Sequence, residues 1–200
     1  AVYRNGFYKT NLTGSWYALM YKANTIQKRY YTEESFNTLP FKDFTKAVLG
    51  EDAEDFKEII KHPDKNDKFW ETRDNNKEIQ EAIKHANIPI LFVTGFYDIY
   101  TGGIFDMWNS LDSETKEKCA LAVHPFDHGG SGIDEPVRFE NGVLESEYKD
   151  YVSNWLNSVR GRCEPPFERG KVTYYKLFDN KWCTDDFYTA KETRRFALGE

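Results

Sequence analysis

Several features that identify a protein's chemistry are scarce or missing in these 200 residues. Cysteine occurs three times, at Cys119, Cys163 and Cys183. Their odd number and the lack of C-x-x-C spacing predict reduced thiols and argue against a disulfide framework or a zinc site. The longest apolar run, residues 88–93, is far too short to span a bilayer, so we expect no membrane partner.

Runs of positive charge are also missing. The 27 basic and 33 acidic residues give a net charge of −6. Such a field repels phosphate backbones, so nucleic acid is not an expected partner. The chain opens without a methionine or a leader-like segment, and the sequence leaves the compartment undecided.

A nucleophile elbow of the form Gly-x-Ser-x-Gly is absent as well. The nearest sequence is Gly129-Gly130-Ser131-Gly132-Ile133, which lacks the last glycine. In α/β-hydrolases the elbow carries the nucleophilic serine and precedes the acid and the histidine of the catalytic triad. Its absence is what a C-terminal fragment predicts, and equally what a protein without enzymatic activity predicts.

The residues that are present suit a packed core or a pocket lined with rings. The hydrophobic share is 40%, with 15 Phe, 13 Tyr and 5 Trp, enough to bury a real core. Residues 11–86 contain no β-rich run. Helical spacing there predicts an amphipathic helix with the stripe Trp16, Leu19, Met20, Ala23 and Tyr30.

The pattern changes after residue 87. Residues 88–94 (Ile-Pro-Ile-Leu-Phe-Val-Thr) form a continuous apolar run that predicts a strand buried on both faces. A helical stripe ending at Leu111 follows, and residues 119–123 predict a second buried strand. Strand, helix and strand in this order predict a βαβ unit with a parallel pair.

Beyond this unit, residues 144–159 carry a wide apolar stripe that predicts a helix lying on the sheet. Residues 163–166 (Cys-Glu-Pro-Pro) indicate a linker, and residues 172–178, followed by Trp182, predict further strands. A fragment lacks part of the sheet that the helix covers, so we expect Trp155 and its neighbours to be exposed.

An acid and a histidine follow the two predicted strands. Asp98 comes just after the first strand and His128 just after the second. Because the carboxyl ends of parallel strands meet at one edge of a sheet, we expect their side chains within hydrogen-bonding reach, about 2.6–3.2 Å. A carboxylate there holds one imidazole nitrogen while the other accepts a proton from a nucleophile. Both residues also fit ordinary loop positions, so the pair is a hypothesis.

Metal binding is the rival chemistry at the same place. His124 and His128 are four residues apart, with Asp127 and Asp134 nearby. That spacing puts two rings on one face only in a helix, and Pro125 at the end of a strand argues against one. We expect neither a metal nor another cofactor.

The residues around this pair resemble a known family. Residues 88–103 resemble the segment that carries the triad Asp in cocaine-esterase-like acyl hydrolases and X-prolyl dipeptidyl-peptidases, and residues 124–129 resemble the segment that carries the triad His. Residues 39–40 and 62–70 are similar to the family's helical cap, and residues 174–182 are similar to the first strands of its jelly-roll domain. The sequence departs from the family pattern at Phe96 and Phe126, where Trp is usual, and at His124, where Gly is frequent.

The resemblance implies an α/β fold, namely the C-terminal part of an α/β-hydrolase sheet with a helical cap and the start of a β jelly-roll domain. Residues 1–86 then correspond to the cap, residues 87–162 to the hydrolase domain, and residues 163–200 to a linker and the first jelly-roll strands. The implied function is that of a serine hydrolase fragment that cleaves an ester or an X-Pro amide through an acyl-enzyme. His128 is the implied general base and Asp98 its orienting carboxylate, with the serine upstream of residue 1.

Two other functions remain open. One is a non-catalytic binding module with an aromatic-rich helical surface, and the other is an acyltransferase on the same fold. Beyond a small ester or peptide substrate, the expected partner is the missing N-terminal half or another copy of the chain, because a truncated sheet leaves strand edges unpaired.

Overall fold

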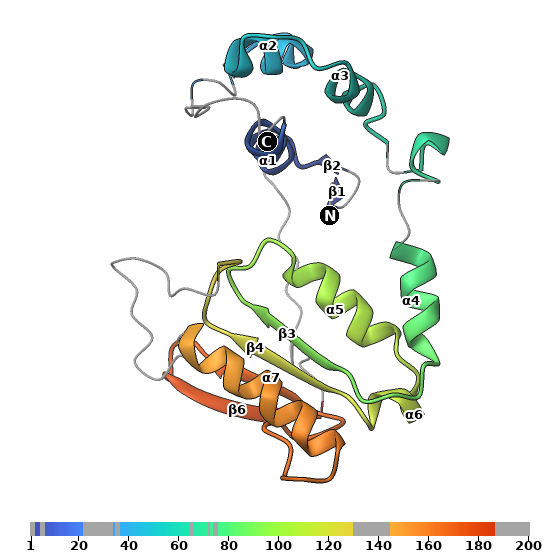
Figure 1. Cartoon of the computed structure of the whole chain (residues 1–200), viewed down its shortest axis with the longest axis vertical. Helices are drawn as coiled ribbons and strands as arrows, with labels where there is room; N and C mark the ends of the chain where they lie inside the picture. The colour runs from blue at the N-terminus through green and yellow to red at the C-terminus, as the bar shows by residue number, and fades with distance from the viewer. Residues whose placement is uncertain are drawn as a thin grey trace, which may run out of the picture. The chain divides into compact units, whose positions relative to one another are not determined.

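The computed structural model describes residues 3–4, 7–21, 34, 37–64, 66–71, 73, 76–129 and 145–186. The chain divides into two compact units, Ala1–Asn75 and Asn76–Glu200 (Figure 1). Among the described residues, none of the helices combines the length and the apolar character needed to cross a membrane.

The first unit is mostly helical. It contains β1 (Tyr3–Arg4), β2 (Phe7–Tyr8), α1 (Thr10–Met20), η2 (Phe41–Asp43), α2 (Phe44–Leu49), α3 (Glu54–Ile60) and η3 (Lys68–Trp70). Its core gathers Ala18 of α1, Phe44 of α2, and Ala53 and Phe56 at α3.

The helix predicted around Trp16 is present as α1 up to Met20, but its aromatic and aliphatic stripe faces outward, and Ala23 and Tyr30 lie outside the described residues. Trp16, Leu19 and Met20 are exposed, whereas Ala18 is fully buried. The small Ala18 side chain lets the rings of α2 and α3 approach α1 closely, and Tyr17 packs against the same cluster.

The second unit contains a four-stranded sheet and its helices. Its elements are α4 (Asn76–Lys84), β3 (Leu91–Gly95), α5 (Thr101–Ser110), α6 (Ser113–Lys116), β4 (Ala120–His124), α7 (Glu145–Val159), β5 (Val172–Lys176) and β6 (Lys181–Asp185). The strand order is β3-β4-β5-β6. Strands β3, β4 and β5 run parallel and β6 is antiparallel to β5. The predicted βαβ unit is confirmed, although β3 begins at Leu91, after Pro89, which has no N–H to donate to a ladder.

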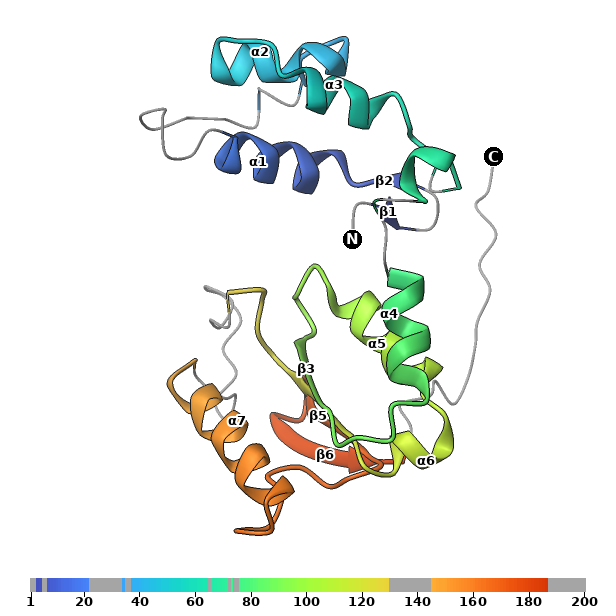
Figure 2. The ribbon, with the colours of Figure 1, turned by 45° about the vertical axis from the view of Figure 1, so that its right-hand side comes forward.

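Helices cover both faces of this sheet, as Figure 2 shows. One face buries Phe92, Leu121 and Val172 against Trp108 of α5. The other face buries Ala120 and Ala122 against Trp155 of α7. Successive residues of a strand point to opposite faces, so two such layers need the continuous apolar runs that the sequence shows.

Two domain expectations differ from this arrangement. Residues 76–86, expected in the cap, lie in the second unit, where Ile83 packs on the sheet core and the carbonyl of Lys84 accepts from the N–H of Asp112 at 3.1 Å. Strand β5, expected to open a jelly-roll domain, pairs with β4 in the same sheet, because Val172 completes its apolar layer. A jelly-roll domain therefore stays a prediction.

The expected exposure of Trp155 is wrong. This side chain is buried against the small residues Ala120 and Ala122. Among the side chains of α7 whose burial the structure describes, the exposed apolar ones are Val152, Leu156 and Val159, which follow one another at steps of four and three residues. They therefore form a stripe on the outward face of the helix.

Candidate active site

The loops that follow β3 and β4 are joined by their backbones. The N–H of Phe96 donates to the carbonyl of His124 at 2.8 Å, and the N–H of Tyr97 donates to the carbonyl of Phe126 at 3.3 Å. Gly95 permits this approach, because a Cβ atom there would lie 2.7 Å from the Phe126 carbonyl carbon and closer still to its oxygen. The two loops are thus held edge to edge by main-chain contacts.

These loops bring Asp98 and His128 together. The Nδ1 atom of His128 lies 3.2 Å from Oδ1 of Asp98. The same carboxylate oxygen accepts from the N–H of Tyr100 at 2.8 Å. A carboxylate can only accept, so in this contact Nδ1 carries the proton, and in a neutral imidazole Nε2 is then the acceptor nitrogen. The Asp98 side chain is 14% exposed and that of His128 is 60% exposed, so the acid is sheltered while the imidazole remains open to a reactant.

The ring of Tyr100 also contacts His128. Their ring centroids are 4.7 Å apart with an interplanar angle of 72°, an edge-to-face arrangement. Nothing in the sequence pattern singled out Tyr100. Its place two residues after the acid, in the same turn, is the signal that identifies it as a neighbour of the histidine.

Two further histidines also pair with carboxylates, so distance alone does not identify a site. His62 lies 2.8 Å from Asp67, five residues on, and its pKa is raised chiefly by that hydrogen bond. His85 lies 2.6 Å from Asp112. The latter carboxyl caps α6, and its pKa is lowered to about 2, first by the N–H of Thr115 and then by His85.

What distinguishes the Asp98–His128 pair is its position on the sheet. His85 comes before β3 in the chain, and Asp112 comes before α6 and β4. Both residues therefore lie at the edge of the sheet where these strands begin, and α6 is found at that edge (Figure 2). Asp98 and His128 follow the same strands and lie at the carboxyl edge. In open parallel sheets that edge is where ligands and catalytic groups gather.

His124, at the end of β4, is an imidazole without a polar partner in the part of the chain that the structure describes. Its side chain is fully buried, and among the described residues neither ring nitrogen has a hydrogen-bond partner. The ring stacks on Phe126 with centroids 4.6 Å apart and meets the edge of Trp182 at 4.8 Å. Burial lowers the pKa of His124 to about 4, because the charged form has lost its water. The sequence showed only that this histidine is unusual for its position.

The metal hypothesis finds no support among the described side chains. Within them, no group of three or more His, Cys, Asp or Glu residues is placed to hold a metal ion. Asp127 instead accepts from the N–H of Gly129 at 2.9 Å. Asp134 and Ser131 lie outside the described residues.

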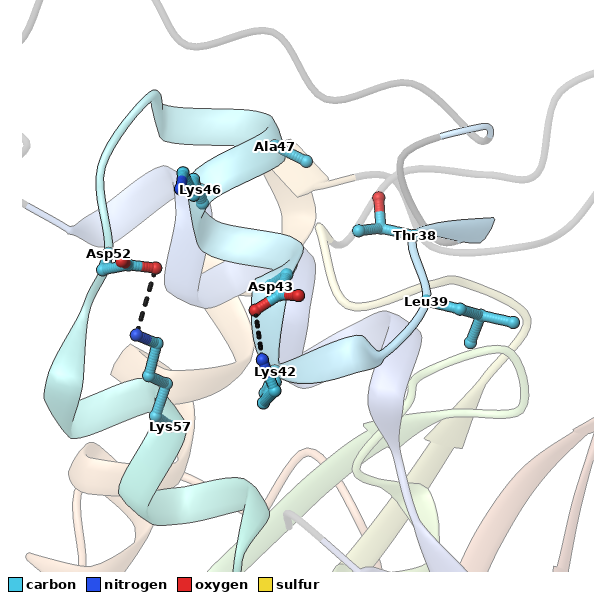
Figure 3. A pocket seen from close by; sticks show the side chains of 8 residues that line it. All are labelled: Thr38, Leu39, Lys42, Asp43, Lys46, Ala47, Asp52 and Lys57. Carbon is cyan, nitrogen blue, oxygen red and sulfur yellow. Dashed lines mark hydrogen bonds and ion pairs between the residues drawn. The ribbon is translucent and has the colours of Figure 1, made fainter.

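A hollow in the first unit has a different character. It is lined by Thr38, Leu39, Lys42, Asp43, Lys46, Ala47, Asp52 and Lys57 (Figure 3). Lys42 pairs with Asp43 at 2.7 Å, and Lys57 pairs with Asp52 at 3.1 Å. Its lining includes no histidine, serine or cysteine, so the chemistry of an acid–histidine pair is not available there.

The comparison with protein families decides the membership of the chain. Residues 1–130 match the family described as X-Pro dipeptidyl-peptidase (S15 family). The chain belongs to this family. The match covers more than half of the chain and includes both Asp98 and His128, and membership identifies the chain as part of a hydrolase family. A comparison with curated proteins finds no significant match.

Proposed function

We propose that Asp98 and His128 are the acid and the base of a catalytic triad in a serine hydrolase that cleaves an ester or an X-Pro amide. The observation that carries this proposal is the contact between His128 Nδ1 and Asp98 Oδ1 at the carboxyl edge of two neighbouring parallel strands. Membership in the S15 family supports the hydrolase class.

In this mechanism, Nε2 of His128 takes the proton from a serine hydroxyl while the serine oxygen attacks the substrate carbonyl. Asp98 stabilises the imidazolium that forms and keeps the ring in the tautomer with Nδ1 protonated. The imidazolium then gives its proton to the leaving alcohol or amine. Water, deprotonated by the same histidine, hydrolyses the acyl-enzyme. The proposal assigns the serine and the oxyanion-hole donors to other parts of the protein, and the reaction uses no cofactor.

The first test is hydrolysis by the 200-residue chain alone. We expect no turnover of p-nitrophenyl esters or Xaa-Pro anilides above the solvent rate, because an acid and a base without a nucleophile leave nothing to acylate. We expect turnover when the preceding segment of the protein is supplied, and its loss with Asp98→Asn. The matched control is Asp67→Asn, which alters the acid–histidine pair of the other unit and should leave turnover unchanged. Turnover by the chain alone that disappears with Ser131→Ala would place the nucleophile elsewhere and overturn this proposal.

A second candidate function is a binding module, favoured by the exposed stripe of α1. Trp16, Leu19 and Met20 present apolar surface on one helical face. If this stripe is the functional surface, replacing all three residues abolishes partner binding, whereas Asp98→Asn does not. If the protein is a serine hydrolase, Asp98→Asn abolishes turnover, whereas replacing the three residues of the α1 stripe does not.

The sheet also supports a proposal about association. Strand β3 is at one end of the strand order within the described sheet, so its outer backbone groups have no strand beside them there. The stripe of Val152, Leu156 and Val159 on α7 is exposed as well. Unpaired strand edges and apolar patches both favour association. We expect light scattering at micromolar concentration to give a mass above 23.5 kDa. A monomer at every concentration contradicts this proposal.

A further inference from the structure

The hydroxyl group of Thr101 makes three contacts in the loop that carries Asp98. Thr101 is the first residue of α5. Its Oγ1 atom donates to the carbonyl oxygens of Gly95 and Asp98, the latter at 2.7 Å. It also lies 3.2 Å from the hydroxyl of Thr94. Thr94 is buried in β3, so its hydroxyl needs a protein partner.

The available protons assign the direction of these bonds. Each hydroxyl has one proton to donate and two lone pairs to accept with. The Thr101 proton is shared between the two carbonyl oxygens, which can only accept. Thr94 therefore donates to Thr101, and this bond connects the buried strand β3 to the turn that carries Asp98.

The two carbonyl groups begin two successive turns around Asp98. The N–H of Asp98 donates to the carbonyl of Gly95 at 3.0 Å, and the N–H of Thr101 donates to the carbonyl of Asp98 at 3.2 Å. Each carbonyl has a second lone pair, which the Thr101 hydroxyl occupies. One side chain thus connects both turns and fixes the backbone from which the Asp98 carboxylate projects.

We propose that Thr101 is a positioning residue of the acid–histidine pair, whose hydroxyl holds the two turns so that Asp98 Oδ1 meets His128 Nδ1. The proposal rests on the proposed function and deepens it. Thr101 acts through Asp98 and touches no substrate. Because both carbonyls keep a backbone donor when the hydroxyl is removed, its loss changes the aim of the carboxylate more than it changes the fold.

The test reads the tautomer of His128 by nitrogen NMR of the full chain with labelled histidine. In the parent chain we expect the tautomer with Nδ1 protonated to predominate. Thr101→Val keeps the shape of the side chain but removes the hydroxyl. We expect it to lower the ratio of the Nδ1–H to the Nε2–H form by about three- to ten-fold, the factor that loss of one hydrogen bond gives in an equilibrium. Thr101→Ser, which keeps the hydroxyl, should retain the parental ratio.

Two further variants separate the possible causes. Thr94→Val combined with Thr101→Val removes both hydroxyls and leaves no buried donor unpaired. The double variant therefore removes the cost of an unpaired Thr94 hydroxyl, but it still lacks the hydroxyl that holds the two turns around Asp98. The proposal expects the tautomer ratio to stay low in this double variant, and a return to the parental ratio overturns it. The double variant also serves if Thr101→Val alone does not fold.

Asp98→Asn distinguishes failure of this inference from failure of the proposed function. An amide can donate to Nδ1 and so favours the other tautomer. If Asp98→Asn changes the ratio and Thr101→Val does not, the role of Thr101 is overturned while the acid–histidine pair stands. If Asp98→Asn also leaves the ratio unchanged, Asp98 does not hold His128, and both proposals fail.

Discussion

Alanine in place of Gly95 is expected to destabilise the second unit by at least about 3 kcal/mol, or to prevent its folding. A Cβ atom at this position meets the carbonyl group of Phe126 and lies 2.8 Å from Cδ2 of the Phe126 ring. The carbonyl oxygen belongs to backbone that also accepts from the N–H of Tyr97. Neither loop can therefore move aside without breaking the contact that joins them. Urea unfolding followed by tryptophan fluorescence measures the loss.

Gly102→Ala is the matched control for this substitution. Gly102 lies in α5, seven residues further along, and an added Cβ there meets nothing within 4 Å. Alanine has the higher helix propensity, so this variant should be more stable than the parent by about 0.5–1 kcal/mol. Equal midpoints for Gly95→Ala and the parent would show that the two loops do not approach as closely as described.

Acid is expected to destabilise the chain through His124. Its pKa is about 4 in the folded state because of burial, against an ordinary value of about 6.5 in the unfolded chain. Above pH 6.5 the imidazole is neutral in both states and its contribution to stability is complete. As the pH falls from about 6.5 to about 4, the unfolded state binds a proton that the folded state does not. The free energy of unfolding therefore falls by about 3 kcal/mol over this window.

The variant His124→Phe isolates this contribution. Phenylalanine keeps a ring against Phe126 and Trp182 and has no group to protonate. The difference in unfolding free energy between variant and parent should grow as the pH falls from 6.5 to 4. Subtracting the curves matters because carboxyls with a lowered pKa, such as Asp112 at about 2, also begin to lose their contribution to stability as the pH falls toward 4. The contribution of His62, whose pKa is raised, is complete below pH 6.5 and is lost only as the pH rises through its folded-state pKa. A difference that is flat across the window contradicts the burial of an unpartnered His124.

The sequence was sufficient for the βαβ unit and for the location of its acid and histidine. Two apolar runs separated by a helical stripe leave little choice but a parallel pair, and residues that follow such strands share one edge. Asp98 and His128 lie there. Their catalytic role stays a proposal. A short distance between an acid and a histidine does not by itself identify a site, since His85 and Asp112 lie closer together, at the opposite edge of the sheet.

Long-range packing decided what the sequence could not predict. The apolar stretch at Val172 fits any sheet, and only its contact with the layer of Leu121 and Trp108 assigns it to this one. Helical spacing at Trp16 indicated an amphipathic helix but not which side is buried, because Ala18, a small residue, is what the neighbouring rings pack against. The partners of His124 lie up to 58 residues away, at Trp182, beyond the reach of a local pattern.

The pairing of β5 has a consequence for how this unit opens. With β3 on one side and β5 on the other, β4 is an interior strand and all five of its residues are buried. Fluctuations that fray a sheet begin at its outer strands and reach interior strands last. Within the described sheet, the loop of His128 therefore follows an interior strand, and the loop of Asp98 follows an outer one. We therefore expect partial openings of the described sheet to move the loop of Asp98 away before the loop of His128.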